Sequence, residues 1–297
     1  MKLFLGIDGG ASGTTAMVGD ESGRIVGAGR AGPVNDPAAD LASVLHAAIH
    51  AGLGATQVEF EAACLGLSGG VENKEAAARS AIHAKQFLIT HDARIALTGA
   101  TGGEPGVVTI AGTGSIAFGR NAEGRTARAG GWGYAFGDEG SAFDIARQAL
   151  RAALRHEEGW GAATRLRGAL LESSGARDAN DLLHRFYSGE ISRPAFAQCA
   201  ALVDAAACAG DASAGEILRN AAQSLATFAS AVRANLFAPG ETVLFSHAGR
   251  VFDSNLLRER FRILIELGEN NRFAAPRFSP AQGALIEAYR LAGMSPY

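Results

Sequence analysis

Two short runs rich in glycine and hydroxyl residues could hold an anion with their main chain. Residues 8–14 read DGGASGT, and residues 111–115 read AGTGS. Each run lies between two apolar, strand-forming stretches, so each predicts a tight turn between strands. Such a turn exposes N–H and hydroxyl groups and can hold a phosphate without a lysine. A plain hairpin would explain the glycines, but it would not explain an acid, Asp8, at the end of a buried strand.

A second acid, Asp92, follows a short apolar run at the predicted junction of a strand and a helix. On position alone it is most simply a helix N-cap. Open α/β sheets, however, bind ligands at the carboxyl ends of their strands. Asp92 is expected to share that edge with Asp8, Ser68 and the turn at Thr113. A catalytic base is therefore as good an interpretation as a cap, and His91 is expected only to be its neighbour.

The third run of interest is GGWGYAFGDEGS, residues 130–141, which leads into an alanine-rich helix. A large indole flanked by glycines, beside two carboxylates, is an unusual composition for a plain surface loop. It suggests a site where a flat ligand stacks and where its hydroxyl groups are held.

The elements around these runs alternate between strand and helix over the first hundred residues, which predicts a mixed α/β layer. Beyond residue 141 the chain is expected to be mostly helical, with one helix over 193–209. The run TGGEPG before the second turn is the best boundary. We therefore expect one domain over 1–102 and another over 103–297, with a final helix at about 281–293 packing back on the first. Early in the chain, Asp36 is expected to cap a helix.

Composition narrows the class of protein. The chain has 297 residues, a net charge of −3, 47% hydrophobic and 19% charged residues. These values are typical of a soluble globular protein, and the net charge lacks the excess of positive residues expected of a nucleic-acid-binding protein. Cys64, Cys199 and Cys208 show no paired spacing, which argues for a reducing compartment and against a disulfide framework or structural zinc. We expect a cytoplasmic protein without membrane or nucleic-acid partners; a homodimer is left open.

The motifs GIDGG, DARIAL, IAGTGSIAFG and GGWGYAFGDEGS occur in this order and together carry a family resemblance. They closely resemble motifs of the N-acetylglucosamine kinase and BadF/BadG/BcrA/BcrD ATPase family, within the sugar kinase, chaperone and actin superfamily. The resemblance covers most of the chain. It implies an α/β fold with two ribonuclease H-like (actin-like ATPase) domains, a cleft between them, and a second domain enlarged by helices. It also implies an ATP-dependent kinase that phosphorylates the 6-hydroxyl of an amino sugar, most simply N-acetylglucosamine.

The resemblance also implies roles for individual residues. Asp92 would be the catalytic base and would contact the sugar, and Asp8 would hold Mg²⁺ through water. The nucleotide would be bound by Asp8, Gly9, Gly10, Ser12, Thr14, Gly112, Thr113, Gly114 and Gly249. The sugar would be bound by Asn35, Ser68, Asp92, Ser115, Gly131, Trp132 and Asp138. Small-molecule amino sugar and nucleotide are thus the expected partners, with ATP and Mg²⁺ as cofactors.

Two departures from the family pattern bear on the nucleotide. Residues 11–13 read Ala-Ser-Gly where the family usually carries Gly-Thr-Lys, although Ser12 keeps a hydroxyl group. Residues 249–251 read Gly-Arg-Val in place of the usual Gly-Gly-Val, and Arg250 would either stack on adenine or obstruct it. The preferred base is therefore left open, as is the identity of the amino sugar.

Other functions in the same superfamily are less well supported. A BadF-type ATPase that activates a dehydratase by electron transfer needs cysteines to bind an iron–sulfur cluster, and ligand spacing is missing here. A ROK-type kinase is disfavoured because its zinc-binding cysteine cluster is absent. A non-catalytic sugar or nucleotide sensor stays open, although retention of Asp8, Asp92 and Asp138 argues weakly against it.

Overall fold

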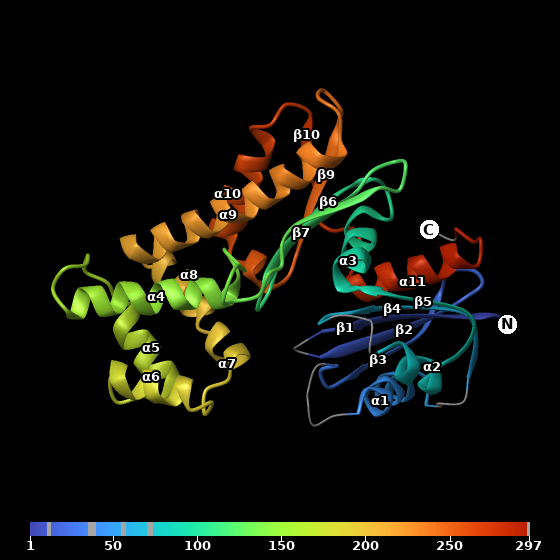
Figure 1. Cartoon of the computed structure of the whole chain (residues 1–297), viewed down its shortest axis with the longest axis horizontal. Coiled ribbons are helices and arrows are strands. Elements are labelled where there is room, and N and C mark those ends of the chain that lie inside the picture. The colour runs from blue at the N-terminus through green and yellow to red at the C-terminus, as the bar shows by residue number, and fades with distance from the viewer. Residues whose placement is uncertain (11–12, 35–39, 55–57, 70–73, 296–297) are drawn as a thin grey trace. The chain divides into compact units, whose positions relative to one another are not determined.

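The computed structural model describes residues 1–10, 13–34, 40–54, 58–69 and 74–295. The chain divides into two compact units, residues 1–108 together with 275–297, and residues 109–274. Figure 1 shows the elements of both units. No helix in the described ranges is long and apolar enough to cross a membrane.

The first unit is built on a five-stranded mixed sheet in the order β3-β2-β1-β4-β5. Its first three strands form an antiparallel meander, as predicted, and β4 and β5 continue in parallel from β1. The strands are β1 (Leu3–Gly9), β2 (Thr14–Asp20), β3 (Ile25–Ala31), β4 (Glu59–Leu67) and β5 (His83–His91). The parallel strands have their carboxyl ends at one edge of the sheet, which is where the candidate acids lie.

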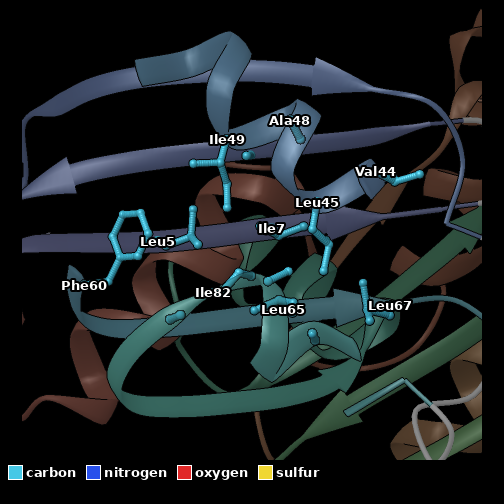
Figure 2. Close-up of a cluster of buried hydrophobic side chains, with 14 of the residues drawn as sticks. Leu5, Ile7, Val44, Leu45, Ala48, Ile49, Phe60, Leu65, Leu67 and Ile82 are labelled. Atoms are coloured by element: carbon cyan, nitrogen blue, oxygen red, sulfur yellow. The ribbon is translucent and has the colours of Figure 1, made fainter. Parts of the chain in front are cut away.

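Both faces of the central strand β1 are covered, which explains why β1 is apolar along almost its whole length. Alternate residues of a strand point to opposite faces. Leu5 and Ile7 therefore pack with α1, as Figure 2 shows, whereas Phe4 packs with α11. The helices of this unit are α1 (Leu41–Leu53), α2 (Glu75–Ala81), α3 (Asp92–Thr101) and α11 (Pro280–Leu291). The C-terminal helix α11 approaches β1 so closely that a side chain at Gly6 would collide with the main chain of Leu285.

The second unit repeats this strand pattern. Its sheet has the order β10-β9-β6-β7-β8, so that β6, β7 and β8 correspond to β1, β2 and β3. The strands are β6 (Gly106–Ala111), which runs across the division between the units, β7 (Ser115–Arg120), β8 (Thr126–Gly130), β9 (Val243–Ala248) and β10 (Asn271–Phe273). The repeat confirms the predicted α/β fold with two related halves.

Helices inserted after β8 enlarge this second unit. They are α4 (Ala142–Glu157), α5 (Leu166–Ser174), α6 (Ala179–Tyr187), α7 (Arg193–Ala197), α8 (Ala200–Cys208) and α9 (Ala212–Leu236). The 3₁₀ helix η1 (Arg250–Asp253) and α10 (Asn255–Glu266) follow β9.

Two helix predictions are wrong in detail. The single helix expected over 193–209 is interrupted at Gln198 and Cys199, giving α7 and α8. The expected cap Asp36 lies outside the described residues, and α1 begins instead at Leu41 with Asp40 as its N-cap.

Candidate active site

The carboxyl ends of β1, β4 and β5 bring three predicted site residues to one edge of the first sheet. Asp8 lies opposite Gly66 on β4, and Leu67 of β4 lies opposite His91 on β5. Ser68 follows Leu67, and its N–H donates to the carbonyl oxygen of Gly9 at 2.9 Å. Asp92 follows His91. This edge therefore carries Asp8, Ser68 and Asp92, as the strand-end argument predicts.

Asp8 is a partly buried carboxyl group near a second one. Burial, and to a smaller extent the negative charge of Asp92, raises the pKa of Asp8 from 3.8 to about 6. Because desolvation disfavours the charged form, an ionised Asp8 is held in an unfavourable environment at neutral pH. A structural aspartate in a turn would rarely be arranged this way, so the shift marks a candidate functional group.

Asp92 is the first residue of α3 and does not cap it. The N-cap is His91, whose Nδ1 accepts a hydrogen bond from the N–H of Arg94 at 3.3 Å. The capping interpretation of Asp92 is therefore wrong, and His91, expected only to be its neighbour, is itself the N-cap. Burial raises the pKa of Asp92, against the opposing effects of the Ala93 N–H, His91 and Lys74. A partly desolvated carboxylate at a strand end is a suitable general base.

Lys74 is a positively charged residue at this edge of the sheet that the sequence analysis did not identify. Its Nζ donates to the carbonyl oxygen of Ser68 at 2.6 Å. Burial lowers the pKa of Lys74, while the negative charge of Asp92 acts in the opposite direction. Lysine is a common surface residue, and only its position six residues after Ser68 could have pointed to it.

The first glycine-rich turn is described only in part. The N–H of Gly10 donates to the carbonyl oxygen of Gly13 at 2.9 Å, which closes the turn after Gly9. The hydroxyl group of Thr14 donates to the carbonyl oxygen of Gly32 at 2.7 Å, so its proton is used by the main chain. The predicted site residues Ser12 and Asn35 lie outside the described residues.

In the second unit, hydrogen bonds connect the second turn, residues 111–115, to the loop that follows β8. The N–H of Gly112 donates to Gly114 O at 2.9 Å, and Gly112 O accepts from Ala142 N at 2.8 Å. The hydroxyl group of Ser115 donates to the carbonyl oxygen of Glu139 at 2.7 Å. These bonds hold Thr113 at the tip of a main-chain turn beside the start of α4. The geometry suits a phosphate held by N–H groups.

Asp138 is the buried acid of this second edge. It has a φ of 62°, unusual for a residue other than glycine, and is only 8% exposed. Its Oδ1 accepts a hydrogen bond from the N–H of Ser115 at 3.2 Å. Burial raises the pKa of Asp138, while the Ser115 N–H and Arg193 act to lower it. Backbone strain at a buried acid is typical of a functional site.

Gly131 and Trp132 are connected to Asp138 through Ser115, at the end of the second turn. The N–H of Gly131 donates to the carbonyl oxygen of Ser115 at 2.9 Å. Trp132 is 67% exposed, and the guanidinium carbon of Arg128 lies 5.0 Å from its ring centroid. An indole this exposed in an ordered loop is available to stack on a ligand.

Gly249 joins the same group of residues by close packing. It has a φ of 95°, and a Cβ there would lie 2.3 Å from the carbonyl oxygen of Ala111. Only glycine allows this approach to the second turn. Arg250, which follows it, is exposed at the start of η1.

The described residues thus form two sets, one on each unit. Asp8, Ser68 and Asp92, with Lys74, share the edge of the first sheet, and Gly112, Thr113, Gly114, Ser115, Gly131, Asp138 and Gly249 gather around the second turn. In the described part of the chain no three His, Cys, Asp or Glu residues cluster as metal ligands. The first set contains a candidate base, and the second contains main-chain N–H groups and a buried acid.

Comparison with known proteins finds relatives along most of the chain. The chain is 34% identical to an N-acetylmuramic acid/N-acetylglucosamine kinase of Clostridium acetobutylicum over 279 residues, covering 90% of this chain and 91% of the relative. It is 31% identical to an N-acetyl-D-glucosamine kinase of Dictyostelium discoideum over 246 residues, covering 75% of this chain and 77% of the relative.

Among solved structures, one from Chromobacterium violaceum, described as a candidate N-acetylglucosamine kinase, matches with a TM-score of 0.77 and 28% identity. It covers 96% of this chain and 98% of that chain. Residues 5–288, which include both turns, both strand-end acids and the loop of Asp138, match the family model described as the BadF/BadG/BcrA/BcrD ATPase family. The order of the motifs and the fold that positions them therefore have one explanation: the chain belongs to the BadF/BadG/BcrA/BcrD ATPase family.

Proposed function

We propose that this protein is a sugar kinase that transfers the γ-phosphoryl group of ATP to the 6-hydroxyl of N-acetylglucosamine. The observation that carries the proposal is Asp92, a partly buried carboxyl group at a strand end, directly after the helix N-cap His91. The names of the two relatives, both kinases of N-acetylated amino sugars, support the substrate class.

In the proposed reaction, Asp92 accepts the proton of the sugar hydroxyl as the hydroxyl oxygen attacks the γ-phosphorus. A base works best when its pKa lies near the working pH. Burial of Asp92 raises its pKa in that direction, while the positive charge of Lys74 acts to lower it. Ser68, whose carbonyl oxygen binds Lys74, would contact the sugar from the same edge.

The phosphates would be held by the turn at residues 112–114, with Gly249 against its base. Asp8 fits a role in binding Mg²⁺ through water, because magnesium prefers carboxylate oxygen and keeps several waters. Burial, and to a smaller extent the charge of Asp92, raises the pKa of Asp8, and a bound divalent cation would stabilise its ionised form. When bound, Mg²⁺ would neutralise phosphate charge. The nucleotide base stays unassigned beside Arg250.

The sugar would lie against the buried acid and the exposed indole of the second unit. The carboxylate of Asp138 would accept hydrogen bonds from ring hydroxyl groups, while Trp132 would cover the methyl of the N-acetyl group. A methyl group in an apolar contact contributes about 1–3 kcal/mol to discrimination between substrates. Glucose, which lacks the acetyl group, should therefore be the poorer substrate. A cytoplasmic location and a homodimer stay predictions.

The electron-transfer alternative is disfavoured by the cysteines. Cys64 and Cys199 are buried, and Cys208 is exposed. Burial raises the pKa of the Cys64 thiol far above its usual range, which opposes the thiolate that an iron–sulfur cluster requires. One exposed cysteine per chain is too few ligands for a cluster shared by two chains.

The test is a coupled assay of purified protein with Mg·ATP and N-acetylglucosamine, repeated with Asp92→Asn. We expect the variant to lower kcat by about 10²- to 10⁴-fold while leaving sugar affinity nearly unchanged. Asp178→Asn is the matched control, because Asp178 is an exposed acid that caps α6 and accepts from Asp181 N. Wild-type turnover in Asp92→Asn would exclude Asp92 as the base. Sugar binding by a wild-type protein without turnover would favour the sensor alternative.

A further inference from the structure

The loop over residues 131–140 is held at two points by one ion pair of α4. Asp144 and Arg147, one turn apart on this helix, pair through Oδ1 and Nη2 at 2.7 Å. The other carboxylate oxygen of Asp144, Oδ2, accepts a hydrogen bond from the N–H of Gly140 at 3.1 Å. The other terminal nitrogen of Arg147, Nη1, donates to the carbonyl oxygen of Tyr134 at 3.3 Å. The pair therefore connects two separate parts of the loop to α4.

These two points lie beside the proposed sugar contacts. Tyr134 comes two residues after Trp132, and Gly140 comes two residues after Asp138. Residues 133–137 form a local turn that is closed by main-chain hydrogen bonds of 3.2 and 2.8 Å. The bond from the guanidinium to Tyr134 ties this turn to the helix, so the pair sets the path of the chain on both sides of the turn.

The side chain of Tyr134 is held as well. Its ring packs edge-on against Phe143 of α4, with 5.2 Å between the ring centroids. The guanidinium carbon of Arg193, the first residue of α7, lies 4.8 Å from the centroid of the same ring. The main chain and the ring of Tyr134 are thus both fixed, and with them the position of the chain that follows Trp132.

Stability alone is a poor explanation for the pair. Asp144 is buried, and Nε of Arg147 is a buried N–H group without a hydrogen-bond partner in the part of the chain that the structure describes. Burying an unpartnered donor is unfavourable, and a buried ion pair is weak evidence for stability. A guanidinium, however, holds its two terminal nitrogens in a rigid fork. It can therefore bridge a carboxylate and a main-chain carbonyl, which the single nitrogen of a lysine does less well.

We propose that Arg147, together with Asp144, is a positioning residue for the sugar, because it fixes the loop that presents Trp132 and Asp138. This role rests on the proposed sugar kinase function and adds to it a pair that acts through the loop. A loop that is ordered before the ligand arrives lowers the cost of binding. Proton transfer is assigned to Asp92, outside this loop. Loss of the pair should therefore weaken sugar binding and change kcat less.

The experiment measures kcat and KM for N-acetylglucosamine and for glucose in wild type, Arg147→Gln and Arg147→Lys. Arg147→Gln should raise KM for N-acetylglucosamine about 10-fold or more, the usual effect of losing a hydrogen bond to a charged group. It should also narrow the preference for N-acetylglucosamine over glucose, because a displaced Trp132 no longer covers the acetyl group. Arg147→Lys should recover part of both losses. The ratio of kcat/KM values for two sugars does not depend on the fraction of folded protein, so a merely structural role would leave it unchanged.

A second measurement follows the loop itself. Hydrogen exchange of residues 131–140, read by mass spectrometry, should be faster in Arg147→Gln than in wild type, whereas exchange of β6 should be unchanged. Arg262→Gln is the matched control, because Arg262 pairs with Glu259 at the same spacing on α10, at 3.0 Å. The double variant with Asp144→Asn should lose little more than Arg147→Gln alone, since the two residues act as one unit.

Unchanged KM and sugar preference in Arg147→Gln would overturn the role of the pair, and so would unchanged exchange of the loop. In both cases turnover by the wild-type protein would leave the proposed function standing. A wild-type protein that phosphorylates neither sugar would instead overturn the proposed function, and hydrogen exchange would still decide whether Arg147 fixes the loop.

Discussion

Replacing Asp8 by asparagine is expected to stabilise the protein at neutral pH while it removes activity. The pKa of Asp8 is about 6 in the folded protein, against 3.8 for an ordinary aspartate. Above pH 6 the carboxyl is ionised in both the folded and the unfolded chain, so the folded state bears the whole cost of the buried charge. At about 1.4 kcal/mol per pH unit, the difference between the two pKa values corresponds to about 2–3 kcal/mol. Asparagine has a similar shape without the charge, so this cost disappears.

The stability gained by Asp8→Asn is expected to depend on pH. Below pH 3.8 the carboxyl is neutral in both states, and asparagine should make little difference to the free energy of unfolding. Between pH 4 and 6 the advantage of Asp8→Asn should grow, and above pH 6 it should stay constant. The assay is urea unfolding in EDTA at pH 4.5, 6 and 7.5. A lower urea midpoint for Asp8→Asn than for wild type at pH 7.5 would refute the reasoning, because it would mean that the ionised carboxylate is stabilised by its surroundings.

Asp20→Asn is a matched control at the end of the neighbouring strand β2. It is expected to destabilise the protein at neutral pH, whereas Asp8→Asn is expected to stabilise it. The Ser22 hydroxyl group, which donates to Asp20 at 2.6 Å, lowers the pKa of that carboxyl. Its ionised form therefore stabilises the fold at neutral pH, and this contribution is lost as the pH falls. Asp20→Asn should lower the urea midpoint at pH 7.5. Adding Mg²⁺ should stabilise wild type more than Asp8→Asn if Asp8 helps to hold the cation.

Three further predictions concern activity. Because the pKa of Asp8 is about 6, kcat/KM should fall as the pH drops through 6, measured as a pH–rate profile. Trp132→Ala should narrow the preference for N-acetylglucosamine over glucose by about 10-fold or more, mainly by harming the acetylated sugar; an unchanged ratio of kcat/KM values would remove Trp132 from the explanation. Gly249→Ala should raise KM for ATP, because its Cβ would collide with Ala111 O, whereas Gly124→Ala, at a positive φ with open space around it, should not.

Most of the strands and turns that position the candidate site residues could be predicted, because short stretches of sequence determine them. The strands flanking both turns are short apolar runs bounded by glycine, and in the first sheet burial on both faces keeps the run of β1 continuous. The edge shared by Asp8 and Asp92 followed from parallel pairing alone. The helix cap, in contrast, was misassigned by one residue. His91 and Asp92 are both polar, and only the observed hydrogen bond to the Arg94 N–H distinguishes the cap from the first helical residue.

Lys74 and Arg193 could not be predicted, because nothing local distinguishes them from surface cations. Lys74 is relevant through its bond to Ser68 O, and Arg193 through its stacking on Tyr134, about sixty residues earlier in the chain. The break between α7 and α8, which separates Arg193 from a longer helix, occurs without glycine or proline. Tertiary packing decides such features, and single-sequence periodicity does not report it.

The repeated sheet explains how one fold provides two kinds of chemistry. β1 and β6 occupy the same place in their sheets, and each is followed by a glycine-rich turn. β1 presents Asp8 near its end, whereas β6 ends in Ala111, whose carbonyl oxygen is packed against Gly249. An acid at the second position would bring another negative charge toward the turn that is proposed to bind phosphate, and repulsion would weaken that binding. The difference between the two strand ends therefore supports the proposed division, in which the carboxylates of the first unit serve the proton and the cation. In the second unit, main-chain N–H groups of the turn would hold phosphate, while the Asp138 carboxylate, which accepts from the Ser115 N–H, would bind the sugar.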